Sequence, residues 1–68
     1  MNRETQITIF RTGRRLPIRS TWRRVSTVAS AQTILHRRDR IIEADGRRWR
    51  VENIRDGLAI LRAESPAV

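Results

Sequence analysis

The stretch RIIEADGRRWRVENIRDGLAILRA, residues 40–63, decides the fold because it holds three short apolar-rich runs separated by two Asp-Gly pairs. The pairs are Asp45-Gly46 and Asp56-Gly57. Asp-Gly favours tight hairpin turns, since these turns need a positive φ that glycine adopts without steric penalty. The stretch therefore predicts a three-stranded antiparallel meander. Its strands are expected at residues 40–44, 47–54 and 58–63.

A strand is also expected at residues 5–12, TQITIFRT, which are rich in β-branched side chains. Residues in a strand point alternately to its two faces, so Ile7 and Ile9 occupy one face and Phe10 the other. We therefore expect the face that carries the two isoleucines to pack in the core. The glycine and two arginines that follow, residues 13–15, predict a turn.

The middle of the chain allows two interpretations. Its β-branched residues predict a strand over residues 21–29, followed by a short helix or irregular turn across residues 30–33. The alternative is a helix over residues 28–38, on which Val28 and Leu35 would share one face. Ser26 or Thr27 would cap that helix.

Five short strands joined by tight turns predict an all-β fold, a small five-stranded and partly closed barrel of the SH3-like kind. Closure is favoured because it removes exposed strand edges. A helix over residues 28–38 would make the fold α+β instead. A chain of 68 residues builds a single core, so we expect one domain over residues 1–68. Residues 1–3 and 64–68 are expected to be frayed ends.

The chain has no cysteine, which fits a reducing cytosolic setting. No apolar run approaches the roughly 20 residues that a membrane-spanning helix needs. The first residues do not resemble a secretory signal. We therefore expect a cytoplasmic protein that does not act at a membrane.

Charge is the dominant feature of the composition, with 15 basic residues against 7 acidic ones and a net charge of +8. Every basic residue is arginine, which codon bias in a GC-rich genome explains, but codon bias does not explain the surplus. The surplus predicts an acidic partner, either a nucleic acid or a protein surface. The candidate binding residues are the clustered arginines Arg14, Arg15, Arg23, Arg24, Arg37, Arg38, Arg40, Arg47, Arg48 and Arg50.

Trp22 and Trp49 lie next to arginine clusters, a combination typical of surfaces where arginine meets phosphate and an aromatic ring stacks on a base. In a strand, however, Trp49 shares one face with Val51, and its arginine neighbours share the other. With so few aromatic residues, we expect both tryptophans in the core. On the solvent face, Arg48 and Arg50 would then pair across strands with Glu43 or Glu52.

A catalytic site is not expected. His36 is the single histidine, and with Asp39 it makes only a two-residue candidate for acid–base or metal chemistry. A metal site needs three or four ligands, and no others cluster in the sequence. We predict a non-enzymatic binding module without metal, cofactor or small-molecule substrate.

The order of these elements resembles the small head–tail adaptor (joining) proteins of tailed phages and prophages. That family has a tryptophan-bearing strand with a W-x-x-V pattern ending in a small residue, followed by a terminal hairpin and a leucine-rich last strand. The matching positions are Trp22, Val25 and Ala29, then Arg40-Ile41, Gly46, Trp49, Val51 and residues 58–61.

The resemblance implies a structural role in virion assembly. Copies of the chain would form a ring between portal and tail, bind other phage structural proteins, and line the channel through which DNA passes, in the host cytoplasm or in the virion. The chain departs from the family in length, because members usually carry an extra loop or strand before the terminal hairpin.

Two other functions compete with assembly. The first is a small basic regulator that binds the DNA or RNA backbone, with affinity that falls steeply as salt rises. A helix carrying Arg37, Arg38 and Arg40 would strengthen it, because such a helix enters a major groove. The second is a small inhibitor that docks on a host protein, which we rank last because acidic mimicry is missing.

Overall fold

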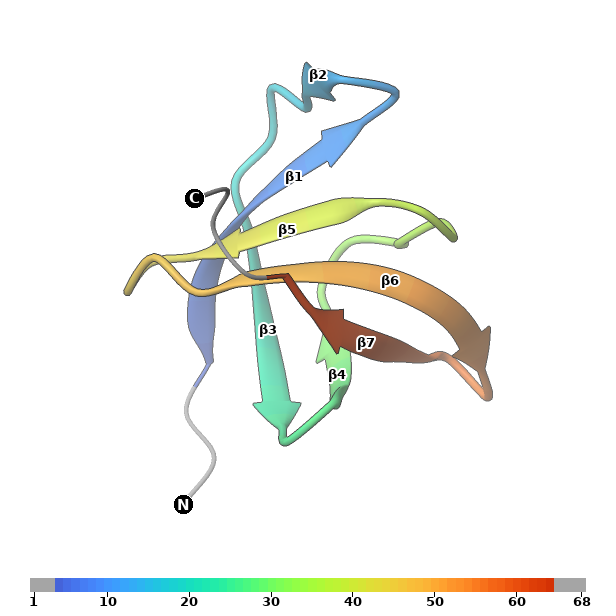
Figure 1. Cartoon of the computed structure of the whole chain (residues 1–68). Coiled ribbons are helices and arrows are strands. Elements are labelled where there is room, and N and C mark those ends of the chain that lie inside the picture. The colour runs from blue at the N-terminus through green and yellow to red at the C-terminus, as the bar shows by residue number, and fades with distance from the viewer. Residues whose placement is uncertain (1–3, 65–68) are drawn as a thin grey trace.

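The computed structural model describes residues 4–64, which form seven β-strands (Figure 1). Every pairing is antiparallel, in the order β2-β1-β3-β4-β7-β6-β5, and a further pairing of β1 with β5 closes the sheet. The strands are β1 (Thr5–Arg11), β2 (Arg14–Arg15), β3 (Ser20–Val25), β4 (Val28–Ala31), β5 (Arg40–Glu43), β6 (Arg48–Arg55) and β7 (Leu58–Ala63).

The prediction of a small all-β barrel is confirmed, with a different strand count. Six strands form a closed antiparallel barrel, whereas five strands and partial closure were expected. The seventh, β2, is a two-residue strand that folds back on the end of β1 and pairs with it outside the barrel, as Figure 1 shows at the top. Its residues, Arg14 and Arg15, were expected in a turn.

The extra barrel strand arises in the middle of the chain, where a single strand over residues 21–29 was predicted. A two-residue turn at Ser26 and Thr27 divides this segment into β3 and β4, with Val25 opposite Val28. Ser26 has a φ of 55°, which reverses the chain at that point. Neither residue is the glycine or asparagine that marks such turns in a sequence.

The alternative helix over residues 28–38 is wrong. Residues 28–31 form β4, which pairs with β3 on one side and with β7 on the other. This strand joins β3 to β7 within the barrel, and its pairing satisfies backbone groups of both neighbours that a helix would leave without partners. The segment after β4 contains bends and a turn, so the short helix allowed across residues 30–33 is absent.

The predicted C-terminal meander is confirmed as β5, β6 and β7. At the second Asp-Gly pair, Asp56 and Gly57 both have positive φ (50° and 76°), the backbone of a type I′ hairpin turn. At the first pair only Gly46 is positive, at 94°. Its amide donates to the carbonyl of Glu43 at 2.8 Å, which closes a slightly wider turn.

The barrel interior is filled by apolar residues from six strands and one loop. Both tryptophans belong to it, as expected, Trp22 with 1% and Trp49 with 8% of its surface exposed. For Trp49 the alternation of β6 predicted this position. Arg48, Arg50 and Glu52 lie on the outer face of β6. The buried apolar residues are Ile7, Ile9, Trp22, Ala29, Leu35, Ile41, Trp49, Val51, Ala59 and Leu61.

The described chain ends at Glu64, which was predicted to belong to a frayed end. Its amide donates to the carbonyl of Arg48 at 2.9 Å, and its carboxylate lies 3.4 Å from the guanidinium of Arg40. Glu64 therefore continues the pairing of β7 with β6. The other residues predicted to fray, 1–3 and 65–68, lie outside the described residues.

Candidate functional site

One of the predicted binding arginines, Arg24, is used inside the protein. Its Nε atom donates to Glu43 Oε1 at 2.8 Å, and its guanidinium lies over the Trp49 ring, 4.5 Å from the ring centre. Arg24 shares a strand face with buried Trp22, two residues away. This spacing was the sequence signal that identifies Arg24 as an inward residue, and it removes Arg24 from the binding candidates.

The Glu43 carboxylate is buried, so it does not pair with Arg48 or Arg50 as one interpretation expected. It accepts hydrogen bonds from the indole nitrogens of Trp49 at 2.6 Å and Trp22 at 3.5 Å. Neither Arg48 nor Arg50 has an ion-pair partner among residues 4–64. Their charges remain available on the outer face.

Asp39, considered with His36 as a possible acid–base pair, is also a structural residue. Its buried carboxylate accepts hydrogen bonds from Arg11 Nε at 3.0 Å and Nη2 at 2.8 Å, and from the His36 amide at 2.8 Å. Burial raises the pKa of Asp39, but these hydrogen bonds outweigh it and hold the pKa below its ordinary value. The same carboxylate raises the pKa of Arg11.

The outer face of the barrel carries a continuous cross-strand row of four arginines and one aromatic residue, which we call the arginine row. Phe10 on β1 is the register partner of both Arg15 on β2 and Arg40 on β5. Arg40 in turn lies opposite Arg50 on β6, and Arg50 opposite Arg62 on β7. Register partners point to the same face, so all five side chains project outward together.

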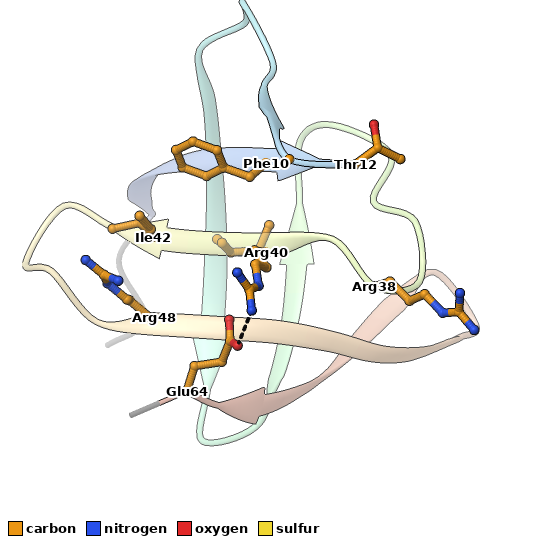
Figure 2. A pocket seen from close by; sticks show the side chains of 9 residues that line it. Phe10, Thr12, Arg38, Arg40, Ile42, Arg48 and Glu64 are labelled. Atoms are coloured by element: carbon orange, nitrogen blue, oxygen red, sulfur yellow. Dashed lines mark ion pairs between the residues drawn. The ribbon is translucent and has the colours of Figure 1, made fainter. Parts of the chain in front are cut away.

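A shallow depression of about 610 Å³ adjoins the arginine row. Figure 2 shows Phe10, Ile42, Arg40 and Arg48 around it, with Glu64 directed toward Arg40. Ile42 pairs in register with Arg48, one step along the strands from the arginine row. The depression therefore combines an apolar patch with guanidinium groups from the adjacent strands β5 and β6 and from the loop before β5.

The structure gathers only some of the predicted arginines. Arg15, Arg40, Arg48 and Arg50 share the outer face, and Arg38 lines the depression through the loop before β5, with its side chain extending away in Figure 2. The remaining candidates belong to neither the arginine row nor the lining of the depression: Arg14 at the β2 end, Arg23 paired with Glu4, Arg37 bonded to the Glu52 carbonyl, and Arg47 paired with Asp45.

Sequence reasoning missed two members of the arginine row, Phe10 and Arg62. Both alternate with buried residues, Phe10 with Ile9 and Arg62 with Leu61, so strand parity placed them on the outer face. Their alignment with the other members of the arginine row depends on the register between strands that are distant in the sequence. No local sequence pattern predicts that register.

Within the described part of the chain, no group of three His, Cys, Asp or Glu side chains is placed to hold a metal ion. Among residues 4–64 there is no helix with the length and apolar character needed to cross a membrane. No protein-family model matches the chain, and neither does a curated protein or a solved structure. The resemblance to head–tail joining proteins therefore stays a prediction.

Proposed function

We propose that this protein is a non-catalytic module that binds the phosphate backbone of nucleic acid through the arginine row. The observation that carries the proposal is the placement of Arg40, Arg50 and Arg62 directly opposite one another on adjacent strands. Like charges in such positions destabilise a sheet. An anionic polymer lying across the strands relieves that repulsion.

Arginine suits this role because its planar guanidinium donates several hydrogen bonds in a fixed geometry that matches phosphate. Neighbouring strands lie about 4.8 Å apart. The row therefore presents three consecutive charges at this spacing on β5, β6 and β7, and Phe10 on β1 separates them from Arg15 on β2. If the four arginines each contact one phosphate of a single-stranded nucleic acid, log affinity falls against log salt concentration with a slope of about −3. Binding through the row is therefore expected to weaken steeply with salt.

The proposal is tested by fluorescence anisotropy with labelled DNA and RNA at low and near-physiological salt. Arg50→Gln removes the central charge of the row and is expected to weaken binding and to reduce the salt slope by about 1. The matched control is Arg55→Gln, on the same strand outside the row. Absence of binding at low salt, or equal losses in the two variants, would overturn the proposal.

A second candidate function is the head–tail joining role. Its supporting observation is that the quoted elements, the tryptophan strand and the terminal meander, form β3 and β5–β7 of one barrel. In that role copies of the chain would assemble into a ring whose arginine rows face DNA. Light scattering over a range of protein concentrations tests it. A ring-sized species supports assembly, and a monomer at all concentrations contradicts it.

A further inference from the structure

We infer that Phe10 is a stacking platform for a nucleobase, so that the protein binds single-stranded nucleic acid in preference to duplex. This inference rests on the proposed function, because it adds a base contact to the backbone contacts of the arginine row. It concerns the one aromatic side chain that the barrel does not bury. The chain has two tryptophans, one phenylalanine and no tyrosine.

The position of Phe10 carries the inference. Trp22 and Trp49 fill the core, whereas Phe10 is on the outer face of β1 and only partly buried. Arg15 and Arg40 are its register partners on the two sides. An aromatic residue with an arginine on each neighbouring strand has the arrangement in which a base stacks on the ring while the flanking phosphates meet arginine.

The surroundings of Phe10 give room for a base. Phe10 lines the 610 Å³ depression together with Ile42, and the Thr12-Gly13 turn borders it. Figure 2 shows the Phe10 ring and the Ile42 side chain on the same side of their two strands. A nucleobase seated there would cover apolar surface that is otherwise in contact with water.

The preference for single-stranded nucleic acid over duplex follows from how accessible the bases are in each form. In a duplex the bases are stacked on one another and paired, so the protein meets mainly sugar and phosphate. In a single strand they are free to rotate out and stack on a side chain. Stacking on one aromatic residue strengthens binding by on the order of tenfold.

The deciding experiment compares an oligothymidylate with an abasic oligomer of the same length and charge, by anisotropy at one salt concentration. We expect the oligothymidylate to bind on the order of tenfold more tightly, and Phe10→Leu to remove most of that difference. Leucine keeps an apolar side chain at the site. Thermal unfolding monitored by circular dichroism confirms that the variant is folded.

The outcomes separate the two proposals. Equal affinity of the wild-type protein for the two oligomers would overturn stacking and leave backbone binding intact, as would a difference that survives in Phe10→Leu. If Phe10→Leu does not fold, the wild-type comparison alone decides. Binding of neither oligomer would overturn the proposed function itself. Tighter binding of polyglutamate than of oligothymidylate would overturn both, in favour of an acidic protein partner.

Discussion

The indole nitrogen of Trp49 donates a hydrogen bond to the Glu43 carboxylate across 2.6 Å, inside the barrel. The same carboxylate accepts from Arg24 at 2.8 Å, and Arg24 in turn covers the Trp49 ring. Three strands, β3, β5 and β6, are thereby tied together by one buried acid. In a chain without disulfides, this network fixes how the meander packs on the rest of the barrel.

Glu43→Ala is expected to destabilise the protein by about 3 kcal/mol, because it leaves Arg24 and an indole N–H in a largely buried site without their acceptor. Urea unfolding followed by tryptophan fluorescence measures the change. Glu52→Ala on the exposed face of β6 is the control and should shift the unfolding free energy by at most about 0.5 kcal/mol. Equal effects of the two substitutions would contradict the structural role of Glu43.

Stability is expected to fall in acid because of Asp39. Its folded-state pKa lies below the ordinary 3.8, so the folded protein binds this proton less readily than the unfolded chain. The contribution of ionised Asp39 to the free energy of unfolding is complete above about pH 5, and it is lost as pH falls through the folded-state pKa. Urea unfolding between neutral pH and about pH 2 should show this loss. In Asp39→Asn this component of the acid sensitivity should be absent, and its persistence would contradict the assignment.

Arg38→Gly is expected to stabilise the protein by up to about 1 kcal/mol. Arg38 has a φ of 73° in the turn that His36 and Asp39 close with a 3.1 Å hydrogen bond. The third position of such a turn favours glycine, because side chains are strained at positive φ. Arg37→Gly, at the preceding position, has no such strain to relieve and should lower the melting temperature. The opposite order of melting temperatures would contradict the turn geometry.

The sequence predicted those parts of the fold that depend on local rules. The Asp-Gly pairs placed the meander, and the alternation of β6 placed Trp49 inside and Arg50 outside. It did not predict the Ser26-Thr27 turn, because neither residue favours positive φ in isolation. For a related reason, the sequence predicted only part of the arginine row. Arg40 and Arg50 stood out as charges, but their alignment with Phe10 is set by the pairing of β1 with β5, in which the partners Phe10 and Arg40 are thirty positions apart along the chain.

Glu64→Gln is expected to tighten nucleic-acid binding. The Glu64 carboxylate lies 3.4 Å from Arg40 on the face that carries the arginine row, where it competes with a phosphate for the same guanidinium. Removing its charge frees Arg40 and should make the salt slope steeper by up to about 1. Anisotropy at two salt concentrations measures both effects. Glu52→Gln is the matched control, because Glu52 lies on the outer face of the neighbouring strand β6 and has no ion-pair partner among residues 4–64. An equal or larger gain there would mean that the effect does not come from freeing Arg40.

Arg50→Glu is expected to raise the free energy of unfolding while it weakens nucleic-acid binding. A glutamate at the centre of the row lies opposite Arg40 and Arg62, so two like-charge pairs become two opposite-charge pairs. The sheet should gain about 0.5–1 kcal/mol, measured by urea unfolding, while affinity for DNA and RNA falls below that of Arg50→Gln. If the arginines served packing alone, Arg50→Glu would not raise stability and weaken nucleic-acid binding at the same time. Loss of stability in Arg50→Glu would mean that the guanidiniums do not repel one another, and the argument for an anionic partner would lose its physical basis.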